Sequence, residues 1–129
     1  MIRPKIVPLT PDLYPGISTL VTESGCAYAT DYTYPSDLAL VALHKDRVVG
    51  LITAWADQRP YAWLDAMIVM PDVRGEGIAY FMYKAMRKLL KERGIKKLWA
   101  FTTYDGWVKK ADRLGLKPIA EVTLLEGEL

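Results

Sequence analysis

One stretch of this chain constrains its fold more than any other: an apolar run that passes through a short glycine-containing turn into an amphipathic helix. The run extends from Tyr61 to Met70 and stops at Pro71. It is too short for a membrane helix and predicts a central β-strand. After a loop over 72–77, apolar residues recur with helical spacing at Ile78, Phe81, Met82, Ala85, Met86, Leu89 and Leu90. A strand feeding a helix through so short a turn predicts a helix that packs back on a sheet.

The rest of the chain divides into shorter segments. Apolar runs over 38–44 and 48–55 flank a polar turn and predict a β-hairpin. A strand is expected over 6–9, followed by a helix that Thr10 caps, that continues to about Ser24 and that ends at Gly25. Beyond the long helix, which Gly94 ends, we expect a strand over 98–103, a helix over 106–114 and a last strand over 119–125. This order predicts a mixed α/β sheet with a parallel pair of strands around the long helix.

Length and composition indicate one domain over residues 1–129. Hydrophobic residues make up 51% and charged residues 25% of the chain, which is enough to bury a core and remain soluble. The N-terminus has no signal-peptide pattern and no run reaches the length of a membrane span, so we expect a cytoplasmic protein. Cys26 is the only cysteine, which excludes an internal disulfide and a cysteine-rich zinc site. We expect no metal.

The charges are distributed unevenly. The first 65 residues carry five basic and seven acidic side chains, whereas the remainder carries twelve basic and eight acidic ones. A basic second half suits a partner that bears phosphate, although a solvated helix face has the same composition. The aromatic residues are not interleaved with the basic residues of 84–97 as a stacking surface requires, so nucleic-acid binding is not expected.

The segment Met67–Ala79 is the strongest indication of function. Backbone N–H groups at the start of a helix have no intrahelical acceptor, and with the helix dipole they form an anion site suited to a pyrophosphate. Gly75 and Gly77 allow the main chain to approach such a ligand, and Arg74 can add positive charge. A Walker loop is excluded because no Gly-Lys-Ser/Thr sequence follows, and Tyr80 stands where a dinucleotide fingerprint has glycine or alanine. Glycines that serve packing alone remain the alternative.

The same segment resembles the GNAT superfamily of N-acetyltransferases. Arg74-Gly75-Glu76-Gly77-Ile78-Ala79 is similar to the R/Q-x-x-G-x-G/A cofactor loop of that family. The resemblance extends over about 38–118 and includes Val48-Val49-Gly50, Arg93-Gly94 and the segment 114–118. It implies an α/β fold with a mostly antiparallel sheet of about six strands, a splayed central parallel pair, and three to four helices.

The resemblance also implies an activity and a cosubstrate. The chain is expected to transfer an acetyl group from acetyl-CoA to a primary amine in a direct ternary complex. Main-chain groups of Met67, Ile68 and Val69 would pair with the pantetheine arm, and an N–H near Met67 or Ile68 would polarise the thioester carbonyl. The pyrophosphate would be bound by the cofactor loop, which comprises Arg74, Gly75, Glu76, Gly77, Ile78, Ala79 and Tyr80. The strands over 61–70 and 98–103 would splay to admit the thioester.

The catalytic residues are less clearly marked. An amine with a pKa near ~10.4 must lose a proton before it can attack. Asp65 is the candidate base because an acid within an apolar strand is costly unless it is paired or functional; its alternative role is to pair with an arginine such as Arg59. Many family members have a tyrosine where this chain has Ala111, so Tyr104 is the candidate hydroxyl, with a packing role as the alternative.

The acceptor and the partners are the least determined part of the prediction. Tyr28, Asp31 and Tyr32 lie where the family forms its acceptor wall, and with Asp37 they favour a cationic amine, although a loop of this composition can simply cover the sheet. The acceptor could be a small molecule or a protein. An exposed sheet edge covered by a second copy would make the protein a homodimer. The competing hypothesis is a catalytically weak CoA-binding module that regulates a partner protein.

Overall fold

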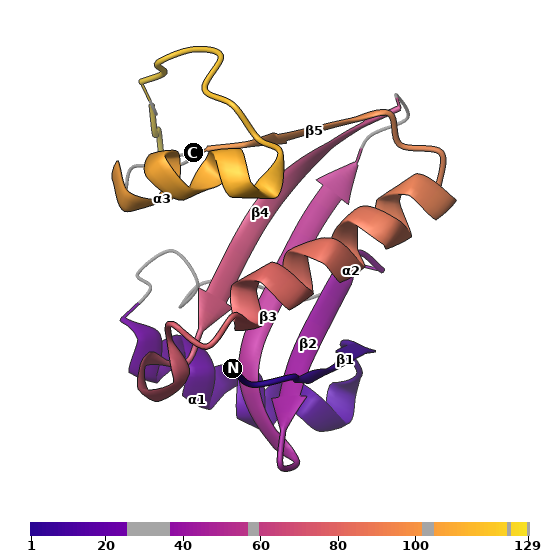
Figure 1. Cartoon of the computed structure of the whole chain (residues 1–129), viewed down its shortest axis with the longest axis vertical. Coiled ribbons are helices and arrows are strands. Elements are labelled where there is room, and N and C mark those ends of the chain that lie inside the picture. Colours follow the sequence, from indigo (N-terminus) through magenta and orange to yellow (C-terminus); the bar gives the residue numbers. More distant parts are fainter. Residues whose placement is uncertain (26–36, 57–59, 102–104, 124, 129) are drawn as a thin grey trace.

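The computed structural model describes residues 1–25, 37–56, 60–101, 105–123 and 125–128, with the backbone alone for 105–107. Its centre is one sheet with the strand order β1-β2-β3-β4-β5 (Figure 1). The strands are β1 (Lys5–Pro8), β2 (Ala39–His44), β3 (Arg47–Ala56), β4 (Tyr61–Val69) and β5 (Lys97–Ala100). The first four are antiparallel, and β5 runs parallel to β4. The predicted fold class is therefore confirmed.

The first helix begins differently from the sequence prediction. A 3-10 turn, η1 (Pro11–Leu13), precedes the helix α1 (Tyr14–Ser24). Thr10 was expected to cap the helix, but its hydroxyl donates a hydrogen bond to the carboxylate of Asp12 instead of accepting one from the backbone. The end of α1 agrees with the prediction, because Gly25 adopts a left-handed conformation with φ of 69°.

The hairpin of β2 and β3 turns through two residues. Lys45 and Asp46 have φ of 52° and 60°, the left-handed backbone that a tight two-residue hairpin turn requires. One extra residue of β3 interrupts the pairing opposite Ala42 and Leu43. The hairpin predicted from the two apolar runs is confirmed.

The parallel pair separates part of the way along β4. The helix α2 (Ile78–Glu92) connects β4 to β5 and ends before Gly94, which has φ of 79°. Pairing between the strands extends from Tyr61 opposite Lys97 to Leu64 opposite Ala100. Beyond this point β4 continues to Val69 with no strand on that edge in the described part of the chain. The pairing thus ends where the expected splay would begin, although residues 102 and 103 of the predicted strand lie outside the described residues.

The helices α1 and α2 cover opposite faces of the sheet; α2 crosses in front of it in Figure 1 and α1 lies behind it. A Cβ on Gly50 of β3 would lie 2.7 Å from the sulfur of Met82 in α2, so the helix and strand meet at the closest approach that a glycine permits. On the other face, a Cβ on Gly16 of α1 would lie 2.5 Å from Val48. The largest fully buried side chains are Ile17, Leu20, Leu51, Ile52, Ile78, Met82 and Met86.

The C-terminal region corrects one prediction. The helix α3 (Asp105–Ala111) and the turn η4 (Asp112–Leu114) lead to Gly115, whose φ is 74°. No strand forms over the described residues 119–123 and 125, so the sheet has five strands instead of six. Ile119, Val122 and Leu125 are 72%, 63% and 86% exposed. Apolar content alone does not make a strand, because a strand also needs a neighbouring strand with which its backbone can pair. None of the helices within the described ranges is long and apolar enough to cross a membrane.

Candidate cofactor and acceptor site

The turn between β4 and α2 leaves a series of backbone donors without acceptors. The 3-10 turn η3 (Pro71–Val73) leads to Gly75 and Gly77, which have φ of 84° and 87°. The first helical hydrogen bond of α2 runs from the N–H of Phe81 to the carbonyl of Gly77, at 3.2 Å. Among the described residues, no acceptor takes the N–H of any residue from Gly75 to Tyr80. Such a series of free donors at the positive end of a helix dipole suits an anion.

The space at this turn agrees with that use. A Cβ on Gly75 would have no heavy atom within 4 Å, so the backbone there is open to a ligand. A Cβ on Gly77 would approach the sulfur of Met1 to 3.3 Å, and the N–H of Ile2 donates to the carbonyl of Glu76 at 3.2 Å. One side of the turn therefore rests on the first residues of the chain.

An ion pair anchors the turn to the hairpin. The guanidinium of Arg47, at the start of β3, lies 2.7 Å from the carboxylate of Asp72 in η3. The hydrogen bond from Arg47 lowers the pKa of Asp72, and the positive charge of Arg47 acts in the same direction. Because both side chains are exposed, the contact serves mainly to fix the position of the turn.

Two other basic side chains lie near the turn. Arg74 turns back toward the strand, and its Nε donates to the carbonyl of Val69 at 3.1 Å. The ammonium of Lys84 in α2 lies 5.4 Å from the ring centre of Tyr80, which is itself exposed. Arg74 and Lys84 therefore bring positive charge close to the loop, which favours a phosphate group.

The open edge of β4 leads from this turn into the sheet. The N–H of Met70 donates to Val49 of β3 at 2.8 Å. Backbone polar groups alternate along a strand, so those of Ile68 also point to β3, whereas those of Met67 and Val69 point to the open edge. The carbonyl of Val69 is the one that Arg74 contacts. Of the three residues predicted to pair with pantetheine, Met67 and Val69 thus present main-chain groups outward.

Asp65 lies where the open edge begins. The register of β3 and β4 shifts between Thr53, opposite Ala66, and Ala54, opposite Leu64, which leaves Asp65 as an extra residue in β4. The hydroxyl of Thr53 donates to Asp65 Oδ2 at 3.4 Å, and the carboxylate is otherwise exposed. A bulge therefore presents the predicted base at the point where the parallel strands separate.

Sequence reasoning missed Thr53 and Arg47 as contributors to this region. Thr53 is 1% exposed and is the one buried polar residue among those described. A threonine within the apolar run 48–55 was the available signal. The pairing of Arg47 with Asp72 spans 25 residues and left no signal in the sequence.

Several predicted residues lie outside the described part of the chain: Tyr28, Asp31, Tyr32, Arg59 and Tyr104. Asp37, which was expected beside the acceptor, forms an ion pair with Arg93 at the end of α2. Ala111, which stands where many relatives have tyrosine, is the last residue of α3.

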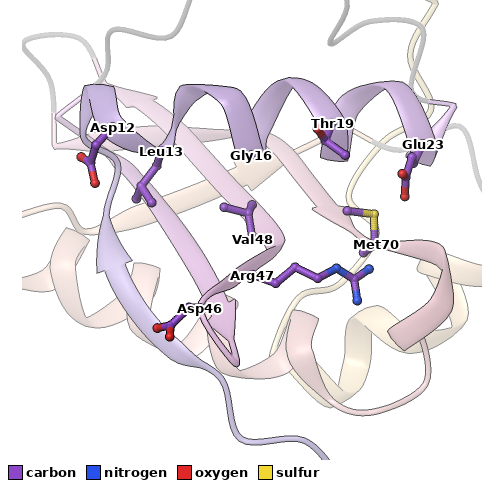
Figure 2. Close-up of a pocket in the computed structure, with 9 residues that line it drawn as sticks. All are labelled: Asp12, Leu13, Gly16, Thr19, Glu23, Asp46, Arg47, Val48 and Met70. Atoms are coloured by element: carbon purple, nitrogen blue, oxygen red, sulfur yellow. The ribbon is translucent and has the colours of Figure 1, made fainter.

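A separate groove of about 600 Å³ lies between α1 and the β2–β3 turn (Figure 2). It is lined by Asp12, Leu13, Gly16, Thr19, Glu23, Asp46, Arg47, Val48 and Met70. None of the described residues predicted to bind the cosubstrate contributes to it. Its one basic group, Arg47, is already paired with Asp72. We therefore place the candidate site at the turn and the open strand edge, where the free backbone donors are.

Comparison with known proteins shows the family and the fold of the chain. The sequence profile of the acetyltransferase (GNAT) family matches residues 9–113. Among solved structures, the aminoglycoside N-acetyltransferase AAC(6')-Iy with a CoA bisubstrate analogue has a TM-score of 0.76 at 14% identity, covering 99% of this chain and 100% of that one. The ribosomal-protein-S18-alanine N-acetyltransferase from Escherichia coli has a TM-score of 0.73 at 15% identity, covering 88% and 77%.

A transcriptional regulator from Bacillus halodurans C-125 has a TM-score of 0.79 at 15% identity, covering 97% of this chain and 100% of that one. At such low identities, what these structures share with this chain is the fold. No curated protein matches the sequence.

Proposed function

This chain belongs to the GNAT acetyltransferase family, and we propose that it transfers the acetyl group of acetyl-CoA directly to a primary amine. One observation carries the proposal: within the described residues, the free N–H groups of the turn from Gly75 to Tyr80 continue into an unpaired edge of β4 that ends at Asp65. An extended ligand with a pyrophosphate at one end and a reactive group at the other matches that path.

In this proposal the backbone binds most of the cosubstrate. The N–H groups of Gly75, Glu76, Gly77, Ile78, Ala79 and Tyr80 receive the pyrophosphate, and Arg74 adds charge. The outward main-chain groups of Met67 and Val69 hold the pantetheine arm as an added strand would be held. Because Arg74 contacts the carbonyl of Val69, it must either move aside or share that carbonyl with the arm. Ile68 supports the strand through its buried side chain.

Asp65 acts as the base in this scheme. The amine must lose a proton to attack the thioester carbonyl, and the exposed carboxylate at the bulge can accept that proton. An outward N–H of β4 stabilises the oxyanion as the tetrahedral intermediate forms. The C–S bond then breaks, and CoA leaves as a thiolate that takes up a proton from Tyr104, our candidate donor, while the attacking nitrogen releases its second proton to the resulting tyrosinate. Tyr28, Asp31 and Tyr32 are proposed to contact the acceptor.

The acceptor itself is a primary amine of a small molecule or a protein. Similar folds are found in an aminoglycoside N-acetyltransferase and in a ribosomal-protein-S18-alanine N-acetyltransferase, whose names point to different acceptors. The fold alone therefore does not select between them.

Two measurements, made one after the other, test the proposed function. CoA should raise the melting temperature of the protein, and acetyl-CoA should release free thiol in the presence of suitable amines. Pantetheine, which lacks the pyrophosphate and the nucleotide of CoA, is the control and should stabilise the protein less. Absence of any stabilisation by CoA would refute the proposed site, while stabilisation without thiol release on any amine would support a binding module instead.

A further inference from the structure

Five aromatic side chains form a continuous surface across β3, β4 and the end of β5, which we call the aromatic strip: Trp55, Tyr61, Trp63, Trp99 and Phe101. Trp63 lies at the centre and stacks with Trp55 and Phe101 at ring distances of 5.9 and 4.8 Å. Trp99 lies 5.0 Å from both Trp63 and Tyr61. Trp55 and Phe101 are 49% and 61% exposed, so large ring faces remain open to a ligand.

The aromatic strip shares a face of the sheet with Asp65. Side chains two residues apart on a strand point to the same side, so Thr53 and Trp55 are on one face of β3. The hydroxyl of Thr53 contacts Asp65, and the ring of Trp55 stacks on Trp63. The carboxylate and the rings are therefore neighbours, separated along β3 by about 7 Å, the rise of two residues.

This face is the one away from α2. Gly50 faces Met82 of α2, and Thr53 is three residues further along the same strand, so it points to the opposite side. A cosubstrate arm on the open edge of β4 and an acceptor on the strip could both reach Asp65 without occupying the same space.

Resting on the function proposed above, we propose that the aromatic strip binds the ring of an arylalkylamine acceptor while Asp65 receives its ammonium group. Aromatic rings stack on the exposed faces of tryptophan, and the nearby carboxylate provides the complementary charge for a cation. A two- or three-carbon linker places the amine and the ring at the spacing of Asp65 and Trp55. Acceptors of this class are therefore preferred over alkylamines of equal size.

A matched set of amines tests this preference: 3-phenylpropylamine, 3-cyclohexylpropylamine and n-hexylamine. The ratio of kcat/KM for the phenyl compound to kcat/KM for the cyclohexyl compound is expected to be about 3 to 10. A lower KM for the phenyl compound should account for this ratio. The substitution Trp55→Leu should reduce this ratio to about 1 to 2, whereas Trp55→Phe should restore most of it. Tyr14→Leu, which removes an exposed ring in α1 outside the strip, should leave the ratio unchanged.

A binding measurement separates this inference from the proposed function. The indole N–H signal of Trp55 in ¹H–¹⁵N spectra should shift on addition of 3-phenylpropylamine and not on addition of n-hexylamine, without any acetyl-CoA. If amines are acetylated but the three compounds react alike, the inference is wrong and the function stands. If the ring binds at Trp55 but no amine is acetylated, the strip is supported and the proposed function is wrong.

A second copy of the chain is the main competing occupant of the aromatic strip. Sedimentation of the wild-type protein and of Trp55→Glu distinguishes it. A wild-type dimer that becomes a monomer on this substitution, with no shift of the Trp55 signal on addition of the arylalkylamine, would overturn the proposal and assign the strip to self-association. A monomer that binds the arylalkylamine supports it.

Discussion

The hydroxyl of Thr53 on β3 donates to the carboxylate of Asp65 on β4, at the one position where β4 has a residue more than its partner. The contact is long at 3.4 Å, and Thr53 itself is buried whereas Asp65 is exposed. A bulge turns a side chain out of the regular alternation and fixes its direction through the neighbouring strand. Thr53 thus positions the carboxylate that we assign as base.

Removal of the carboxylate should abolish most of the turnover without loss of cosubstrate binding. A positioned base contributes about 10²- to 10⁴-fold to such reactions, so Asp65→Asn should lower kcat by that factor. Steady-state thiol release measures the effect, and the stabilisation by CoA should be unchanged. Asp46→Asn is the matched control, because asparagine tolerates the left-handed backbone at that exposed position. A kcat for Asp65→Asn within a factor of three of wild type would exclude this role.

Thr53→Val tests the positioning role separately. The substitution keeps the shape and removes the hydroxyl, and the loss of one hydrogen bond predicts a decrease in kcat of about 2- to 10-fold. Thr53→Ser should recover the activity because it restores the donor. If the serine variant is as slow as the valine variant, the effect comes from packing of the strand and the hydroxyl has no part in it.

The glycines of the turn should be needed for CoA binding beyond their effect on stability. Gly75 has φ of 84°, and a Cβ there meets nothing within 4 Å, so Gly75→Ala costs about 1–2 kcal/mol of backbone strain in the free protein. Gly25→Ala is closely matched, with φ of 69° and equally open space. Both should lower the free energy of unfolding similarly in urea titrations.

Only the substitution at Gly75 should also reduce the rise in melting temperature that CoA produces, since its methyl group would occupy the path of the ligand. Equal CoA stabilisation of the two alanine variants would show that the turn does not bind the pyrophosphate.

The Arg47–Asp72 ion pair should stabilise the folded protein near neutral pH and lose this effect in acidic solution. The folded-state pKa of Asp72 lies below its unfolded value of about 4. Between these values the unfolded chain binds more protons, so stability falls as the pH falls through the folded-state pKa. Arg47→Met should therefore destabilise the protein at pH 7 and pH 5 alike, and less in more acidic solution.

Urea unfolding at several pH values measures this dependence, with Lys45→Met as a control that removes a neighbouring charge. Titration of Asp72 by ¹³C NMR should show its pKa rising toward the ordinary value in Arg47→Met. An unchanged pKa would mean that the pair does not persist in solution.

Much of the fold followed from local patterns. The left-handed glycines Gly25 and Gly94 end their helices as predicted, because their conformation is set by the few residues around them. The hairpin and the turn before α2 are likewise local, and the free N–H groups of that turn follow from the start of a helix alone. The family was also evident from the segment 74–79 together with the order of elements.

The segment 119–125 shows where local pattern fails. Its apolar content predicted a strand, yet no strand forms over its described residues. A strand requires a paired edge as well as suitable residues, and the sequence carries no information on whether that edge is available.

The sequence alone determined the helix ends, the hairpin and the position of the anion-binding turn, since each depends on contacts between residues close in the chain. The tertiary structure decided where β4 and β5 separate, that Asp65 is an extra residue opposite Thr53, and that Arg47 pairs with Asp72. It also gathered Trp55, Trp63 and Trp99 from three strands into one surface. These features depend on register between strands, which is fixed only when distant segments pack together.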